Sequence, residues 1–360
     1  MIFVFLGLVT ASGIVWRKSK WISIFIIAFD IILCVGCSKS YDLINLQNMY
    51  EQPNVFHEDV AIGWDYFFRL CIGSGIPWLL FKAICATITL GLLYFSMKRV
   101  IGVDNFVLSI YTISLLMFQI TQIRNGLAFS IVLFGATFLL KKEKGSVIKY
   151  LIFLLIATLI HYSMFVYIIL VFVLFAKDRK RYFIKILCIT IMLIIILGTN
   201  IMAIVGEKIL SGHNRIIQYL DFSNAIHSIN SHSIKSLLIY WGMQIIVLFS
   251  STIICNYKHT IAAKNLYRIS LEEQRMHSMI MTTIVFAPLI VLSLSYFRLI
   301  RNMIVLLYMQ TATIPVIKTR EDIRERRLSS SVVFITALTI WLMTAYMEGE
   351  GFTVLNSFKL

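Results

Sequence analysis

The sequence predicts an all-α fold, a polytopic membrane bundle of about twelve transmembrane helices. We expect these helices to form a single domain over residues 1–360. Hydrophobic residues make up 59% of the chain and charged residues 14%, with a mean hydropathy of +0.84. A soluble domain has about 25% charged residues and could not bury so large an apolar share. Only helices and closed barrels satisfy the backbone in lipid, and long Ile- and Leu-rich runs without strict alternation indicate helices.

Each apolar run is taken as one helix. At about 20 residues per crossing, twelve helices use about 240 residues and leave about 120 for connections. The predicted helices cover residues 2–16, 21–37, 76–97, 102–120, 123–140, 148–161, 163–176, 184–205, 236–256, 279–297, 302–317 and 331–347.

Basic residues occupy every second connection between these helices. Those connections hold 23 Lys and Arg and 8 Asp and Glu, while the opposite side holds nine of each, so the whole net charge of +15 lies on one side. Excess Lys and Arg mark the cytoplasmic side of a membrane protein. The charge therefore indicates orientation, and we expect no nucleic-acid partner. The basic clusters are Arg17–Lys20, Lys98 with Arg99, Lys141–Lys149, Lys177–Lys185, Lys258–Arg275 and Lys318–Arg327.

The apolar stretch 150–176 has basic clusters at both ends, so it must cross the membrane twice or re-enter. Two short helices would then meet at His161. A single long crossing also fits the length and would reverse the orientation of everything that follows. Two long segments, 38–75 and 206–235, fall on the outer side and offer room for a recognition surface.

Four ionisable residues lie at the outer ends of predicted helices: Arg124, His161, Arg298 and Arg301. Ionisable groups at membrane depth are costly and suggest function unless they can reach the surface. Arg298 and Arg301 are three residues apart and would share a helix face. Guanidinium groups bind phosphate in a bidentate manner, which predicts a clamp for a lipid-linked pyrophosphate. The alternatives are interfacial anchoring for each arginine and a hydrogen-bonded interior position for His161.

Several motifs are missing from the chain. It has neither a GxxxxGK[ST] loop nor an Asp-x-Asp pair, which disfavours an ATP-driven pump and a metal-dependent nucleotide-sugar transferase. Cys34 and Cys37 form a lone CxxC without a second ligand pair, so we expect no metal and no cofactor. Inside the spans, Asp30 and Lys82 could form a buried ion pair. A lipid-linked oligosaccharide flippase, another polytopic transporter and a membrane acyltransferase with a histidine base remain alternatives.

Residues 122–170 carry a compact pattern. An Arg is followed by Asn and then Leu-Ala at the start of one helix, and a short basic loop leads to a helix that ends in His, with Ser two positions later. This pattern resembles the central signature of EpsG-type proteins, the bacterial exopolysaccharide and O-antigen polymerases grouped with Wzy. The matching positions are Arg124, Asn125, Leu127, Ala128, Ala157, His161 and Ser163.

The outer segment 38–75 matches the EpsG-type pattern only in part. Such proteins tend to carry a Gly-Thr-Asp-aromatic start and a later Glu-Pro-Gly-aromatic motif. The nearest counterparts here are SYDLINLQNMY around Asp42 and AIGWDYFF around Asp65, and the glutamate and proline of the second motif are missing.

The resemblance implies a GT-C-like polymerase or ligase architecture in the bacterial inner membrane, with the active site facing the periplasm. The implied reaction is metal-independent transfer between undecaprenyl-pyrophosphate-linked oligosaccharides, with membrane lipid and a chain-length regulator as further partners. Arg124, Arg298 and Arg301 would stabilise the leaving pyrophosphate, and His161 would orient the acceptor or remove its proton. The residues expected to bind substrate are Asp42, Asp65, Asn125, Tyr162 and Tyr296.

The orientation can be tested with single cysteines in a background without the native ones. An impermeant thiol reagent added to intact cells should label positions 57 and 227 and leave positions 143 and 322 unmodified, because only the first two lie on the predicted outer side. Labelling at 322 in intact cells would contradict the orientation.

Overall fold

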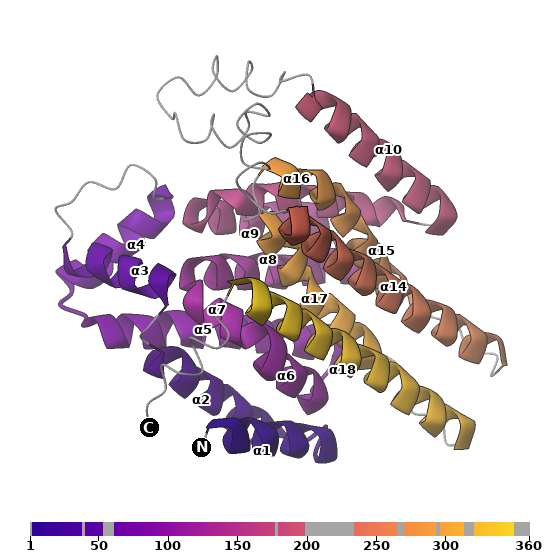
Figure 1. The fold of residues 1–360 in the computed structure, drawn as a ribbon, viewed down its shortest axis with the longest axis horizontal. Coiled ribbons are helices and arrows are strands. Elements are labelled where there is room, and N and C mark those ends of the chain that lie inside the picture. Colours follow the sequence, from indigo (N-terminus) through magenta and orange to yellow (C-terminus); the bar gives the residue numbers. More distant parts are fainter. Residues whose placement is uncertain are drawn as a thin grey trace. The chain divides into compact units, whose positions relative to one another are not determined.

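The computed structural model describes residues 2–37, 40–52, 61–176, 179–198, 234–264, 270–292, 296–312 and 320–348. Within these ranges the chain is helical and contains no strand, which confirms the all-α prediction for the described part (Figure 1). The chain forms two compact units, which are described separately. Unit 1 comprises Met1–Val171 and Tyr308–Leu360, and unit 2 comprises Phe172–Leu307.

Unit 1 holds the amino-terminal helices and the last long helix. The span predicted at 102–120 is one helical segment interrupted by a π-helical turn, η1, and the chain after His161 is a 3-10 helix, η2, which runs into unit 2. The elements are α1 (Ile2–Val15), α2 (Lys20–Gly36), α3 (Tyr41–Glu51), α4 (Ile62–Gly73), α5 (Trp78–Ile101), α6 (Asn105–Tyr111), η1 (Thr112–Leu116), α7 (Met117–Thr121), α8 (Ile123–Lys141), α9 (Ser146–Ile160), η2 (Tyr162–Phe175) and α18 (Arg320–Glu348).

Buried Asp104 joins two connections of unit 1. Its carboxylate accepts from Arg17 Nε at 3.2 Å and Nη2 at 2.9 Å, and it also caps α6 by accepting from the Phe106 N–H. The neighbouring Asn105 side chain donates to the Trp16 and Ser19 carbonyls at 2.6 and 2.8 Å. The turn after α1 is therefore fixed to the start of α6.

Glu143 joins two further connections at this end. Its carboxylate accepts from Arg99 at the end of α5, and Lys149 lies 3.4 Å away. The Arg99 guanidinium also lies 4.3 Å from the centre of the Phe138 ring, a cation–π arrangement. Three of the predicted basic connections thus lie at one end of unit 1, as the alternation of charge requires.

The stretch 150–176 folds back on itself. The Tyr150 hydroxyl on α9 donates to the Tyr167 carbonyl in η2 at 2.6 Å, and both tyrosines are fully buried. In one straight helix these residues would lie about 28 Å apart, at about 1.5 Å per α-helical residue and 2.0 Å per 3-10 residue. A single long crossing is therefore excluded, and the chain reverses at His161.

The segment 38–75, predicted as an outer loop, contains two helices, α3 and α4. An aromatic cluster holds them against α5, with Tyr50 of α3, Trp64 and Phe68 of α4, and Phe81 of α5 at ring-centre distances of 4.9 to 5.7 Å. The Tyr50 hydroxyl donates to the Ile76 carbonyl at 2.7 Å, and burial raises its pKa, so it remains a donor. The segment predicted at 206–235 lies outside the described residues up to Ser233.

The expected ion pair between Asp30 and Lys82 is wrong. Lys82 donates instead to the Val35 carbonyl at 2.8 Å and to the Cys37 carbonyl, both at the carboxyl end of α2. Asp30 accepts from the Thr112 hydroxyl at 2.9 Å. The last carbonyls of a helix have no partner within it, so a buried ammonium satisfies them directly.

Unit 2 contains α10 (Arg179–Gly198), α14 (Ile234–Lys264), α15 (Leu271–Thr282), the 3-10 turn η3 (Thr283–Phe286), α16 (Ala287–Leu292) and most of α17 (Phe297–Ala312). Buried polar pairs fasten α15 to its neighbours: Ser251 with His277 at 2.9 Å, Lys258 with Glu273 at 3.4 Å, and Tyr182 with Thr282 at 2.6 Å.

The helix predicted at 279–297 begins earlier and is interrupted. The interruption is the 3-10 turn η3, which directly precedes Ala287 and Pro288. Proline lacks an N–H and its ring clashes with the carbonyl four residues before it, so the regular α-helical pattern is broken there.

Each of the twelve predicted helices overlaps a described helix. Among the described residues, three helices are long and apolar enough to cross a membrane, namely Trp78–Ile101, Ile123–Lys141 and Ser236–His259. The count of twelve crossings and the GT-C likeness stay predictions.

Tyr150→Phe tests the bond that holds the chain reversal. The variant leaves the buried Tyr167 carbonyl without its donor, and we expect a loss of about 1 kcal/mol in unfolding free energy. Thermal unfolding in detergent measures this loss. Tyr94→Phe, on half-buried Tyr94 of α5, serves as the control and should unfold like the parent. Equal unfolding temperatures for all three proteins would contradict a structural role for the bond.

Candidate active site

The hairpin of α8 and α9 brings the two ends of the sequence signature together. The helices pack closely at Gly135, where an added Cβ would lie 2.7 Å from the Phe153 side chain. Lys142 and Gly145 take left-handed backbone conformations and reverse the chain between them. From this turn the chain runs about 26 Å back to Arg124 and about 22 Å on to His161, at about 1.5 Å per residue. The start of α8 and the end of α9 are therefore nearly level (Figure 1).

His161 terminates α9. Its backbone is extended, with φ −149° and ψ 111°, its N–H donates to the Ala157 carbonyl at 2.8 Å, and its own carbonyl accepts from Met164. The imidazole Nδ1 lies 2.9 Å from the Ser163 hydroxyl oxygen. This hydrogen bond fixes the ring of a half-buried histidine at the point of chain reversal.

The neighbouring predicted residues occupy the same end of the hairpin. Arg124 is half-buried and Asn125 is buried in the first turn of α8, while Tyr162 beside His161 is exposed. A cation, an amide, an imidazole and a phenol thus lie at one end of a two-helix unit. Such groups can bind an anion and move a proton, provided that a substrate reaches all of them.

Helix α4 crosses the end of α9. Gly63 approaches Leu159 so closely that a Cβ at position 63 would lie 2.8 Å from the Leu159 carbonyl oxygen. Asp65 follows Gly63 by two residues, and His161 follows Leu159 by two. The structure thus brings the segment around Asp65 to the His161 end, where Asp65 accepts from Arg69 Nε at 2.8 Å.

The remaining predicted site residues lie on or beside other helices, away from the end of the α8–α9 hairpin in the sequence. Asp42 is half-buried in the first turn of α3. Arg298 and Arg301 lie in the first turns of α17, Arg301 with 2% exposure, and half-buried Tyr296 precedes the helix. These three residues belong to unit 2, whereas Arg124 and His161 belong to unit 1. Convergence of the three arginines therefore stays a prediction.

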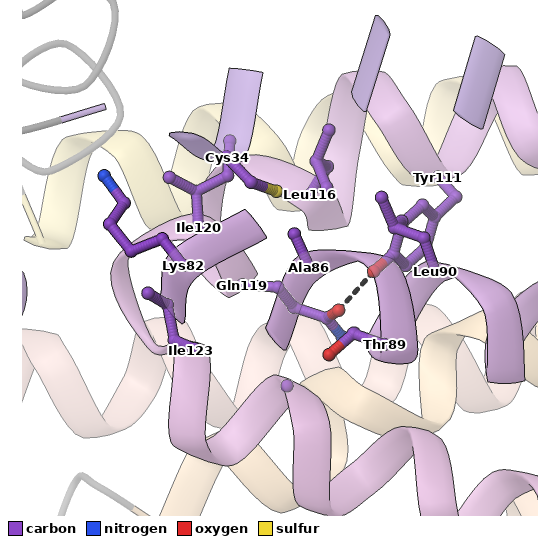
Figure 2. A pocket seen from close by; sticks show the side chains of 11 residues that line it. Cys34, Lys82, Ala86, Thr89, Leu90, Tyr111, Leu116, Gln119, Ile120 and Ile123 are labelled. Atoms are coloured by element: carbon purple, nitrogen blue, oxygen red, sulfur yellow. Dashed lines mark hydrogen bonds between the residues drawn. The ribbon is translucent and has the colours of Figure 1, made fainter. Parts of the chain in front are cut away.

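A small cavity of about 20 Å³ lies beneath the start of α8. It has room for about one water molecule, so it is too small for a substrate. Figure 2 shows the Cys34 sulfur and the Gln119 amide among its walls, with Gln119 accepting a hydrogen bond from the Tyr111 hydroxyl. The lining residues are Cys34, Lys82, Ala86, Thr89, Leu90, Tyr111, Leu116, Gln119, Ile120, Ile123 and Gly126. Across the described ranges, no group of three or more His, Cys, Asp or Glu could hold a metal ion.

The long apolar helices, with polar residues gathered at their ends, define a multi-pass membrane protein. A family model matches residues 20–357, nearly the whole chain, and describes the EpsG family. The chain belongs to the EpsG family, which confirms the resemblance of residues 122–170 and supports a membrane polysaccharide polymerase-type role. No curated protein and no solved structure is significantly similar to the chain.

The sequence interpretation missed Arg69 and the contact of α4 with α9. Asp65 and Arg69 are four residues apart, which is the spacing of an ion pair on a helix. The pair could therefore have been predicted from the sequence if the segment had been predicted as a helix. Gly63 gave no such signal, because its need for a small residue arises only from the packed position of Leu159.

Gly63→Ala tests the crossing of α4 and α9. The added methyl group would overlap the Leu159 backbone, which cannot rotate away, so we expect α4 to shift and the unfolding free energy to fall by about 1 to 3 kcal/mol. The control is Gly73→Ala on the same helix, where a Cβ meets nothing within 4 Å. Thermal unfolding of both purified variants makes the comparison, and similar unfolding temperatures would contradict the close contact.

Proposed function

We propose that the chain polymerises lipid-linked oligosaccharide repeat units on the outer face of the bacterial inner membrane. The observation that carries the proposal is the pairing of Arg124 and His161 at one end of the α8–α9 hairpin, in a chain of the EpsG family. The donor would be a growing glycan on undecaprenyl pyrophosphate, and the acceptor would be the terminal hydroxyl of an incoming repeat unit.

The reaction needs a base and a stabilised leaving group. The acceptor oxygen forms a bond to the anomeric carbon of the donor while the bond from that carbon to the pyrophosphate oxygen breaks. Undecaprenyl pyrophosphate leaves as a stable anion, its lipid still attached, while the acceptor hydroxyl gives up its proton. Cationic groups lower the barrier by binding the charge that develops on the leaving pyrophosphate. We assign this role to Arg124, Arg298 and Arg301, whose guanidinium forks match phosphate oxygens, and therefore propose a metal-independent reaction.

His161 is assigned to the acceptor. If Nδ1 donates its proton to Ser163, the lone pair is on Nε2, which can take the proton that the acceptor hydroxyl loses. Its carbonyl and N–H are both engaged by the turn, so the ring position is set by backbone as well as side-chain bonds. Asn125, Tyr162, Asp42, Asp65 and Tyr296 are proposed to bind the sugars or the carrier.

The partners follow from this chemistry. The substrate carrier is a membrane lipid, and a polymerase that extends chains processively would act with a chain-length regulator. The outer location is supported by the basic connections at the opposite end of unit 1, where Asp104 and Glu143 hold them.

His161→Ala should abolish chain elongation while membrane abundance stays normal, because it removes the proposed proton acceptor without an interior void. Polymer ladders from purified protein and lipid-linked repeat units measure the reaction, and His259→Ala, an exposed histidine of α14, serves as the control. Normal-length polymer from His161→Ala would refute the catalytic role. In the same assay, translocation without chain growth would favour a flippase, and acyl transfer would favour an acyltransferase.

A further inference from the structure

Helix α4 has two apolar faces. Trp64, Phe68 and Cys71 are buried on one face, and Ile62, Tyr66 and Leu70 are exposed on another, by 71%, 70% and 57%. The exposed three are spaced by four residues and so lie along one side of the helix. With a length of about 18 Å, α4 is too short to cross a hydrocarbon core of about 30 Å. A short helix with an exposed apolar face fits the membrane interface, with that face in the lipid chains.

The same helix carries a cation beside the exposed face. Arg69 donates through Nε to Asp65 at 2.8 Å, and its side chain is 61% exposed. A guanidinium has five N–H donors in a planar fork, and this pair uses only the Nε edge. Asp65 therefore steadies the side chain and leaves the two terminal nitrogens to face an anion.

The amino-terminal end of α4 lies against α9, which also has exposed apolar residues. Gly63 contacts Leu159, and on α9 both Leu159 and Leu155 are exposed, by 41% and 61%. Leu159 is followed two residues later by His161, so the contact lies close to the corner of the chain. Arg69 lies beside the exposed face of α4, so a molecule with a long apolar chain and an anionic head would match both the apolar face and the cation.

We propose that α4 binds the lipid carrier of the substrate: the Ile62–Tyr66–Leu70 face takes the polyprenyl chain, and Arg69 binds the pyrophosphate. The inference rests on the proposed polymerase function. The occupant is a polyprenyl pyrophosphate rather than a bulk phospholipid because α4 meets α9 only two residues before His161, at the end of the hairpin that also carries Arg124. Asp65 acts as a positioning residue for Arg69, and not as a ligand of the anion.

The first test measures binding of undecaprenyl pyrophosphate to the full-length protein in phosphatidylcholine nanodiscs. Arg69→Gln should weaken binding about tenfold, since it removes a charge-assisted contact. Arg327→Gln, at an exposed arginine of α18, should bind like the parent. Arg69 is exposed, so the variant should unfold at the parental temperature. Parental affinity in Arg69→Gln overturns the inference alone, whereas a parent protein that does not bind the carrier at all overturns the proposed function as well.

The second test locates the polyprenyl chain. A photoreactive benzoylphenylalanine is placed at position 66 or, as a control, at position 32, where Ile32 of α2 is 68% exposed. Position 66 should capture undecaprenyl pyrophosphate in clear preference to phosphatidylcholine, and position 32 should capture mainly phosphatidylcholine. Equal capture ratios at the two positions would overturn the placement of the chain on α4, because that face would then meet only bulk lipid.

Discussion

The reversal of the chain at His161 is the feature around which the neighbouring helices are arranged, and the bond from Tyr150 to the carbonyl of Tyr167 fastens it. In an apolar interior a hydroxyl and a carbonyl cannot both be left unpaired, so α9 and η2 are held side by side. The reversal places His161 at a corner rather than in the middle of a span. In the predicted topology the reversal keeps the later basic connections on the same side as the earlier ones, because a straight segment of the same length would exchange the two sides.

The basic connections are more than signals of orientation. Asp104 and Glu143 each receive an arginine from a connection far away in sequence, so the charge that marks one end of unit 1 also fastens that end together. The opposite end carries the start of α8, the corner at His161 and helix α4. A rigid base with polar groups at the far end suits the proposed polymerase, which would hold its polar groups still while the proposed lipid-linked substrate binds.

Local patterns were sufficient to predict the hairpin of α8 and α9, since apolar runs set the helix lengths and alternating charge set their directions. From those lengths it followed that Arg124 and His161 would share one end. The helices α3 and α4 were not predicted, because their apolar residues pack on Phe81 and do not form a long run. The pairing of Lys82 was misjudged for a similar reason. The sequence shows that Asp30 and Lys82 carry opposite charges. It does not show that the backbone carbonyls at the end of α2 lie next to Lys82, because that contact depends on how the helices pack.

The bond from Lys82 to the end of α2 has a consequence for how the protein is made. A lysine inside a span opposes insertion by about 3 kcal/mol when the helix enters lipid alone. The carbonyls of Val35 and Cys37 offer this ammonium a partner only once α2 is in place. Synthesis delivers α2 first, so the earlier helix acts as a template that eases the entry of α5. The order of these two helices along the gene thus matches the order in which the membrane can accept them.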